Sequence, residues 1–180
     1  MEGNRVMKQY ISEEYRQLNA ELHKTNKVFG NGRNKWMPCI KQIAREVSIK
    51  TVLDYGCGKG NLVEALRKVG FVVEGYDPAV AKYEAIPESG SDLVVCCDVL
   101  EHVEEEFVED VLDRLKELSS TAFFAVIAMR PSNKILSDGR NTHITLFPSE
   151  KWMELLQSRF PEGSRISYRN KNKLIFKWMK

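Results

Sequence analysis

The sequence predicts an α/β fold in which one mostly parallel β-sheet carries helices on both faces and ends in an antiparallel hairpin. Strand-like runs alternate with helical periodicity between residues 51 and 128, the order typical of a parallel sheet. The runs at 92–97 and 121–128 are apolar almost throughout, as expected for strands that are buried on both faces. Two further runs, 165–168 and 174–178, flank a turn, which is the pattern of a hairpin.

Residues 1–48 are predicted to form a helical cap or lid, and residues 49–180 the core of the chain's single domain. Apolar residues recur at helical spacing in the stripe Met7, Ile11, Tyr15, Leu18 and Leu22. A loop with two glycines (29–33) follows this first helix. We expect the segment either to fold across a ligand cleft, where Arg33 or Lys35 would meet a ligand carboxylate, or only to cap the edge of the sheet.

The remaining elements follow in a regular order along the chain. They are predicted as helix 36–47, strand 51–55, helix 62–69, strand 71–76, strand 92–97, helix 107–118, strand 121–128 and a final helix that Ser149 caps. Asp92 comes only fifteen residues after Asp77, so the connection between these two strands has room for little more than a turn of helix. Residues 129–148 lack clear periodicity, and a loop of this length in a compact domain is usually functional. The tryptophans lie on helix or strand stripes and are expected in the core.

Composition places the chain among cytosolic globular domains. Of its 180 residues, 43% are hydrophobic and 29% are charged. The longest apolar run, 122–129, is too short to cross a membrane, and the N-terminus does not resemble a signal peptide. Four cysteines without a Cys-x-x-Cys pair predict neither a disulfide framework nor a zinc ribbon. We therefore predict a cytoplasmic protein with no membrane partner.

The net charge of +2 conceals a segregation along the chain. Residues 1–50 carry +5, residues 51–120 carry −10 and residues 121–180 carry +7. The simpler interpretation is an unevenly charged surface, and the more specific one is a basic rim that attracts an anionic substrate. The imbalance is too mild to require a nucleic-acid partner.

A glycine-rich loop predicts a ligand site at the end of the first core strand. Gly56, Gly58 and Gly60 lie where that strand turns into a helix. Glycine there tolerates positive φ and lets the backbone come close to a ligand, and ligands of open α/β sheets bind beyond the carboxyl ends of the strands. Asp77, at the end of the next strand, is placed to accept hydrogen bonds from a ribose diol. Together these features predict a nucleoside-containing cofactor.

The residues around the glycines narrow the choice of cofactor. The third glycine of a dinucleotide fingerprint is replaced by Asn61, and Lys59 is followed by Gly60 rather than by the Ser or Thr of a P-loop. An acid, Asp54, precedes the glycines. It would repel a pyrophosphate but suit an ammonium group, which points to S-adenosylmethionine.

Residues 52–60, 75–77 and 92–103 together resemble the class I, Rossmann-like S-adenosylmethionine-dependent methyltransferases, in the compact stand-alone form found in phages and bacteria. The resemblance implies that S-adenosyl-L-methionine binds here and leaves as S-adenosyl-L-homocysteine. It implies cofactor contacts from Asp54, Tyr55, Gly56, Cys57, Gly58, Asp77, Pro78, Asp98, Val99 and Leu100. Of these, Asp54 would lie near the amine, Asp77 would hold the ribose hydroxyls, and Asp98 would lie under the reacting sulfonium. The short connection after Asp77 departs from the fuller family pattern and leaves little of its third strand.

Acidic and imidazole side chains follow the next two central strands. Asp98, Glu101 and His102 come directly after one strand, and His143 lies in the loop after the other. The carboxyl ends of neighbouring parallel strands meet at one edge of a sheet, so these groups are expected to converge. Our catalytic candidates are Asp98, His102 and His143, with an imidazole of pKa ~6.5 taking a proton from the nucleophile.

Two carboxylates and two imidazoles would also suit a divalent metal ion. Asp98, Glu101, His102 and His143 resemble the ligand set of metal-dependent 2′-O-methyltransferases that act on small-RNA ends. They also resemble the Glu-x-x-Glu-His motif of ubiquinone-pathway O-methyltransferases, although the first acid here is Asp. We do not favour a metal, because small methyltransferases without one also carry Glu-His here to position the cofactor and pack the start of a helix.

The favoured function is methyl transfer to an oxygen or nitrogen of a small substrate, with the basic residues Arg130, Lys134 and Arg140 able to receive an anionic group. The alternatives are a metal-assisted 2′-O-methyltransferase of RNA ends and a non-catalytic protein that binds S-adenosylmethionine. Enzymes that methylate DNA bases are excluded. Asp98 does not begin their Asp/Asn-Pro-Pro-Tyr motif, and neither Cys96 nor Cys97 follows the proline of a Pro-Cys nucleophile.

Overall fold

The computed structural model describes residues 10–31, 33–169 and 172–180 and contains a six-stranded sheet in the order β2-β1-β3-β4-β6-β5. The strands are β1 (Thr51–Tyr55), β2 (Val72–Tyr76), β3 (Ser91–Cys97), β4 (Ser119–Ala128), β5 (Ser164–Arg169) and β6 (Lys173–Met179). β1, β2, β3 and β4 are mutually parallel, whereas β6 runs antiparallel to both β4 and β5. The predicted parallel sheet with an antiparallel C-terminal hairpin is therefore confirmed. The turn predicted at 170–172 lies mostly outside the described residues.

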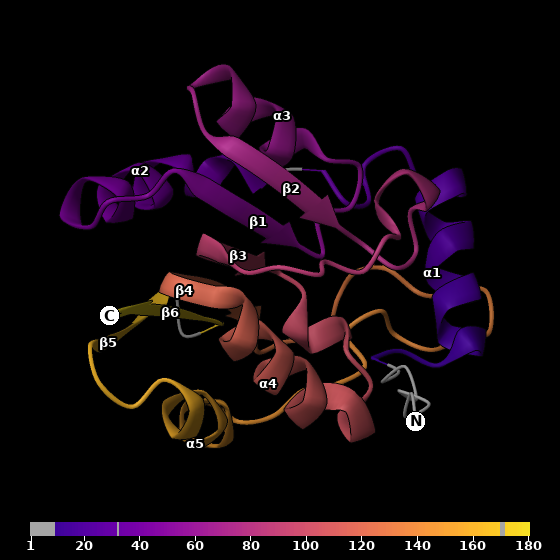
Figure 1. Ribbon diagram of the computed structural model, residues 1–180. Helices are drawn as coiled ribbons and strands as arrows, with labels where there is room; N and C mark the ends of the chain where they lie inside the picture. Colours follow the sequence, from indigo (N-terminus) through magenta and orange to yellow (C-terminus); the bar gives the residue numbers. More distant parts are fainter. Residues whose placement is uncertain (1–9, 32, 170–171) are drawn as a thin grey trace, which may run out of the picture.

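Helices cover both faces of the sheet, as predicted (Figure 1). They are α1 (Glu13–Thr25), α2 (Met37–Glu46), α3 (Asn61–Lys68), α4 (Val108–Leu118) and α5 (Ser149–Arg159). The helices α2 and α3 pack on one face with Ile40, Ile43 and Leu66, and α4 and α5 pack on the other with Leu112 and Trp152. Four 3₁₀ turns join these elements: η1 (Arg33–Trp36), η2 (Ala81–Tyr83), η3 (Leu100–His102) and η4 (Glu105–Phe107).

Burial explains why the central strands are so apolar. Every residue of β4 from Ala122 to Ala128 is buried, and so is β3 from Leu93 to Cys97. Trp36, Trp152 and Trp178 are 3%, 0% and 6% exposed, which confirms that the tryptophans belong to the core. Such side chains each gain about 1.5–3 kcal/mol or more from leaving water, so the two faces hold the sheet together.

Two local predictions were wrong at helix ends. Ser149 is the first residue of α5 rather than its cap: Pro148 takes the cap position, and no side chain bonds there. The stripe predicted for the first helix includes Met7, which lies outside the described residues, and Ile11, which precedes the helix in the structure. Instead α1 begins at Glu13 after Ser12, whose hydroxyl accepts a hydrogen bond from the Tyr15 amide at 3.2 Å, a capping geometry that apolar periodicity does not reveal.

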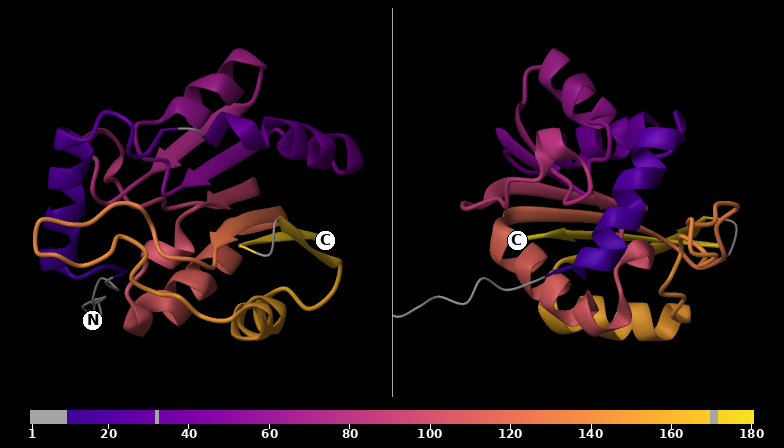
Figure 2. Two further views of the ribbon diagram at one scale, coloured as in Figure 1. Left: turned by 180° about the vertical axis from the view of Figure 1, so that it is seen from behind. Right: turned by 90° about the vertical axis from the view of Figure 1, so that its right-hand side faces the viewer.

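The sheet topology positions a crevice. The strands that follow β1 in the chain lie on opposite sides of it, β2 on one side and β3 on the other. The carboxyl end of β1 is therefore a topological switch point. Helix α1 lies across the carboxyl ends of β1 and β2, and the loop 129–148 runs up to it (Figures 1 and 2). The connection after β2 holds only η2, and the described chain places no strand on the outer side of β2. Among the described residues, no helix has the length and apolar character that spanning a membrane requires.

Candidate functional site

A cavity of about 360 Å³ opens at the carboxyl ends of β1, β2 and β3. Among the sequence-predicted site residues, those that line it are Tyr55, Gly56, Asp77, Pro78, Asp98, Val99, His102 and His143. Asp54, Cys57, Gly58, Leu100 and Glu101 are buried and do not line the cavity. The predicted crevice thus brings together residues from three strand ends and from the loop 129–148.

The glycine-rich loop has the backbone geometry that its sequence requires. Gly56, Gly58 and Gly60 have φ values of 71°, 57° and 77°, in the left-handed region that glycine alone enters without strain. Gly56 also has no room for a side chain, because an added Cβ would lie 2.5 Å from a methyl group of Val99. Of these three glycines, Gly56 lines the cavity and presents bare backbone there, which a ligand can approach closely.

Asp77 is fixed at the mouth of this loop. One carboxylate oxygen accepts a hydrogen bond from the Gly58 amide at 2.8 Å, and the other accepts one from the Ala79 amide at 3.0 Å. A carboxylate oxygen has two lone pairs, so each keeps one acceptor position for a ligand hydroxyl. The side chain is only 8% exposed, yet it lines the cavity. This is the arrangement that recognition of a diol needs.

Asp54 occupies the middle layer of the sheet rather than the cavity. In β1 it pairs with Gly75 of β2 and Val95 of β3, and it is fully buried. It points to the α2 and α3 face together with Val52, because side chains two apart on a strand share a face.

Asp98 is held in a strained backbone conformation between two lysines. It is the one non-glycine residue of the described chain with positive φ, at 53°, which costs about 1 kcal/mol or more. Its carboxylate contacts the ammonium group of Lys173 and, at 3.2 Å, that of Lys35. Burial alone would raise the pKa of Asp98, but the two ammonium groups outweigh it and lower that pKa. Asp98 is therefore a fixed anion at the centre of the site.

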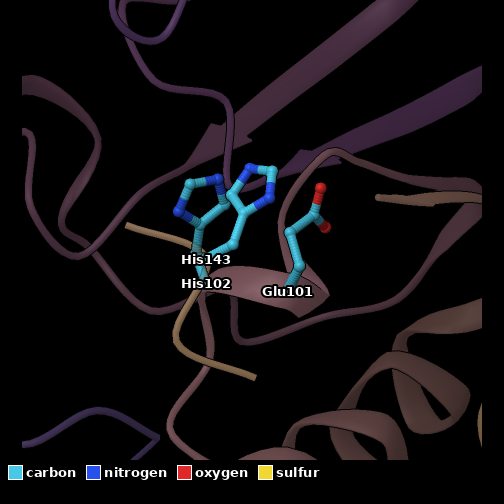
Figure 3. A group of neighbouring side chains, drawn as sticks. All are labelled: Glu101, His102 and His143. Carbon is cyan, nitrogen blue, oxygen red and sulfur yellow. The ribbon is translucent and has the colours of Figure 1, made fainter. Parts of the chain in front are cut away.

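Glu101, His102 and His143 form a cluster of neighbouring side chains (Figure 3). Their potential ligand atoms all lie within 4.8 Å of one another, and Asp98 is not part of the group. Burial raises the pKa of Glu101 to about 8, and the nearby negative charge of Asp98 adds to this effect. One Glu101 oxygen accepts a hydrogen bond from the Ala128 amide at 2.9 Å, and the other has no hydrogen-bond partner among the described residues.

His143 is oriented by the backbone of its own loop. Its Nδ1 lies 2.6 Å from the carbonyl oxygen of Arg130. A carbonyl can only accept, so the hydrogen lies on Nδ1 and Nε2 of the neutral ring is the acceptor. Burial lowers the pKa of His143, more than the Arg130 carbonyl raises it. The His143 ring meets that of His102 edge to face, with 4.8 Å between centroids.

Helix α1 and the loop 129–148 are fastened to each other over the cavity. The Tyr15 hydroxyl donates to the Thr142 carbonyl oxygen at 3.3 Å, and burial raises the pKa of Tyr15 to about 12, which keeps this donor protonated. Two exposed contacts add to it: Ser137 donates to Glu21, and Arg140 pairs with Glu14. At the start of α1, the Ser12 amide and hydroxyl both donate to the Glu104 carboxylate.

Several basic residues that the sequence analysis singled out form ion pairs of their own. Arg140, predicted to receive an anionic group, is engaged by Glu14 and Asp138 and does not line the cavity. Lys35 pairs with Asp98, and the side chain of Arg33 is outside the described part of the structure.

Sequence reasoning missed Lys173, which lies 75 residues from Asp98 in an antiparallel strand. No local pattern would have revealed that contact. It also missed Phe29 and Tyr76, which line the cavity together with Tyr10 and Tyr15 of the predicted lid segment. The chain has three histidines, and all three line this cavity.

The sequence is similar to a known protein family and to a known enzyme. Residues 7–174 match the family of methyltransferase domains. The ubiquinone biosynthesis O-methyltransferase of Histophilus somni is 37% identical over 70 residues. That match covers 39% of this chain and 29% of the relative, so the chain matches less than a third of that enzyme's length.

Solved structures share the fold at lower identity. Magnesium protoporphyrin IX methyltransferase from Synechocystis, with S-adenosylhomocysteine bound, is 15% identical with a TM-score of 0.64 over 91% of this chain and 98% of that one. The 1,6-didemethyltoxoflavin-N1-methyltransferase of Burkholderia thailandensis is 18% identical with a TM-score of 0.61 over 93% and 89%. The methyltransferase domain of a bacterial protein, CtHen1-CN, is 18% identical with a TM-score of 0.61 over 83% and 100%.

Proposed function

The chain belongs to the class I S-adenosylmethionine-dependent methyltransferases, and from this premise we propose that it methylates an oxygen or nitrogen of a small, negatively charged acceptor. The observation that carries the proposal is the cavity in which Gly56, Asp77, Asp98 and His143 meet. Its volume of about 360 Å³ falls in the range of small-molecule sites. The names of the similar proteins include both O- and N-methyltransferases, so they leave the acceptor atom open.

The residues of the cavity fit the cofactor in several respects. The free lone pairs of Asp77 would accept the two ribose hydroxyls, and the bare backbone at Gly56 allows close approach. Asp98 stays ionised in the lining of the cavity, held by Lys35 and Lys173. When bound, S-adenosylmethionine supplies a methyl group already activated by its sulfonium, and the sulfur keeps the bonding electrons as the acceptor's lone pair forms the new bond.

The chain's own contribution to the reaction would be alignment and proton removal. His143 presents Nε2 as an acceptor, and its lowered pKa keeps the ring neutral at pH 7. This nitrogen would take the proton that a hydroxyl or amine loses on methylation. The fastened helix α1 would exclude water, and holding the reactants in line supplies much of the rate in such displacements.

An assay for S-adenosylhomocysteine release tests the proposal. The purified chain would be incubated with S-adenosylmethionine and a panel of small hydroxy- and amino-acids and their uncharged amides. We expect turnover with at least one charged compound and little with its amide. Binding of S-adenosylmethionine without turnover on any panel member, but with turnover on RNA, would overturn the small-acceptor proposal.

One observation favours a second candidate, a metal-assisted methyltransferase of RNA ends. Glu101, His102 and His143 offer one carboxylate and two imidazoles within 4.8 Å, a donor set that suits zinc or another divalent transition metal. The Glu101 oxygen without a hydrogen-bond partner among the described residues would serve as a ligand. Calorimetric titration with Zn²⁺ and Mn²⁺, and turnover on RNA with and without chelator, distinguish the candidates: chelator-sensitive RNA methylation supports the second.

A further inference from the structure

A second cavity of about 350 Å³ lies next to the first. The two share Asp98, Ser132, Lys134 and His143 as lining residues. Gly56 and Asp77 line only the first cavity, whereas Arg130, Asn133 and Lys173 line only the second. The Asp98 carboxylate and the His143 imidazole therefore lie where the two cavities meet.

The lining of the second cavity is strongly positive. Arg130, Lys134 and Lys173 contribute three cations, and Asp98 contributes the one acid. Neither Arg130 nor Lys134 forms an ion pair with any carboxylate of the described residues. Ser132 and Asn133 add neutral hydrogen-bonding groups. Two cations without an acidic partner, beside a concave surface, leave a net attraction for an anion.

The rim of this cavity is already ordered by hydrogen bonds. The Asn141 side chain accepts from the amides of Ser132 and His143 at 3.0 Å and 2.9 Å and donates to the Ser132 carbonyl at 2.9 Å. The Lys134 amide donates to the Ser132 hydroxyl at 3.1 Å, and a bridge joins Ile135 to Asn141. Such a loop loses little conformational freedom when a ligand binds.

Lys35 has a different place. It lines the first cavity but not the second, and it approaches Asp98 from η1. Lys35 is thus a cation that only the first cavity offers to a carboxylate of the cofactor, whereas Arg130 and Lys173 line only the second cavity and Lys134 lies where the two meet. This separation argues that the second cavity is not an extension of the cofactor site.

We infer that the second cavity binds the carboxylate or phosphate group of the methyl acceptor through Lys134, Arg130 and Lys173, and that this places the acceptor's nucleophile at His143. The inference rests on the proposed function, since it assigns the first cavity to the cofactor. An anion there would share Lys173 with Asp98. The acceptor class is thus a small acid whose hydroxyl or amine lies within a few bonds of the charged group.

Binding of simple probes to the full chain tests the inference. The protein would be saturated with S-adenosylhomocysteine and titrated by NMR with benzoate, phenyl phosphate and the uncharged benzamide. We expect both anions, but not benzamide, to shift the ring resonances of His143. The stronger anion identifies which group the site prefers.

Charge-removing variants locate the site. Lys134→Gln and Arg130→Gln are each expected to lower the affinity for the preferred anion about fivefold, which is the scale of a partly exposed ion pair. Lys177→Gln is the matched control, because Lys177 lies on the same strand as Lys173 but does not line either cavity. The affinity of this variant for the anion should be unchanged. Thermal unfolding of each variant would confirm that it folds.

The outcomes separate this inference from the proposed function. If S-adenosylhomocysteine binds but neither anion does, the anion site is wrong while the cofactor assignment stands. The same holds if Lys177→Gln lowers the affinity for the anion as much as Lys134→Gln does. If the protein does not bind S-adenosylhomocysteine, the proposed function fails, and the inference that rests on it fails too. An anion that displaces S-adenosylhomocysteine occupies the cofactor's own carboxylate position and also overturns the inference.

Discussion

The carboxylate of Asp77 is both oriented by the backbone and accessible from the cavity. Both oxygens are held by backbone amides, from Gly58 and Ala79, and the side chain still lines an open cavity. The same hydrogen bonds that orient it leave one lone pair on each oxygen. The surrounding backbone thus orients the two carboxylate oxygens of Asp77 as hydrogen-bond acceptors in the absence of a ligand.

Asp77→Ala is expected to weaken binding of S-adenosylhomocysteine at least about 10-fold, because hydrogen bonds to a charged group contribute about 1.5–3 kcal/mol. Isothermal titration calorimetry would measure the loss. Asp92→Ala is the matched control, since the Asp92 carboxylate also accepts two backbone amides, from Lys50 and Thr51, but at the opposite end of the sheet. Unchanged affinity in Asp77→Ala, or equal loss in both variants, would contradict the ribose assignment.

His143→Gln is expected to lower turnover by about 10²-fold or more, the scale of general-base catalysis, while cofactor affinity stays nearly constant. The base must be neutral, so in the unmodified protein turnover should rise with pH and reach its plateau near neutrality, because burial lowers the pKa of His143 below 6.5. The pH profile of kcat would show this rise, and the variant would lose it. Loss of turnover and cofactor affinity in equal measure would make His143 a packing residue.

At the level of elements, η3 and the end of β4 are joined by Glu101. Its carboxylate accepts a hydrogen bond from the Ala128 amide, and its carbonyl oxygen accepts one from the Thr145 amide at 3.1 Å. One fully buried acid therefore connects η3, β4 and the loop that carries His143. Because this group is titratable, the stability of the fold around the site depends on pH.

Glu101→Gln tests that coupling. Because burial raises the pKa of Glu101 from 4.5 to about 8, the folded protein keeps a proton that the unfolded chain releases. The resulting stabilisation is full below about pH 4.5 and is lost as the pH rises toward about 8. The neutral glutamine should make the melting temperature less dependent on pH across this range. A slope equal to that of the unmodified protein, or the same flattening in Glu105→Gln, would refute the assignment.

The carboxylate of Glu104 holds the start of helix α1. Glu104 accepts hydrogen bonds from the Ser12 amide at 2.8 Å and from its hydroxyl at 2.5 Å. Glu104→Ala should raise amide exchange across residues 13–25, measured by hydrogen–deuterium exchange, and added S-adenosylhomocysteine should slow it again. Glu105→Ala, which removes only an exposed pair with Lys151, should have no effect there. Unchanged exchange in Glu104→Ala would show that α1 is held in another way.

The elements were predictable to the extent that their causes are local. Apolar runs and bounding glycines located β1 to β4 within about two residues, because burial on both faces leaves a pattern in the sequence itself. The start of α1 and the cap of α5 were wrong because a side chain's capping contact is decided by geometry that periodicity does not record. The side-chain direction of Asp54, behind the cavity wall, follows from its place in the strand rather than from its motif.

For the whole molecule, the site depends on contacts that are distant in sequence. The residues just after strands β1, β2 and β3 were predictable, because a parallel sheet brings those ends to one edge. Lys173 and Tyr15 were not, since they meet Asp98 and Thr142 across 75 and 127 residues. The charge segregation along the chain has its counterpart here: the acidic middle third supplies Asp77 and Asp98, and the basic last third supplies the rim of the second cavity.

Titration of the full chain with S-adenosylhomocysteine, followed by a crystal structure of the complex, tests the central claim most directly. We predict one-to-one binding, with the ribose hydroxyls on the Asp77 carboxylate and the sulfur beside Asp98, in the cavity closed by α1. No measurable heat together with an unchanged melting temperature would contradict the account, as would a ligand that occupies any other part of the surface.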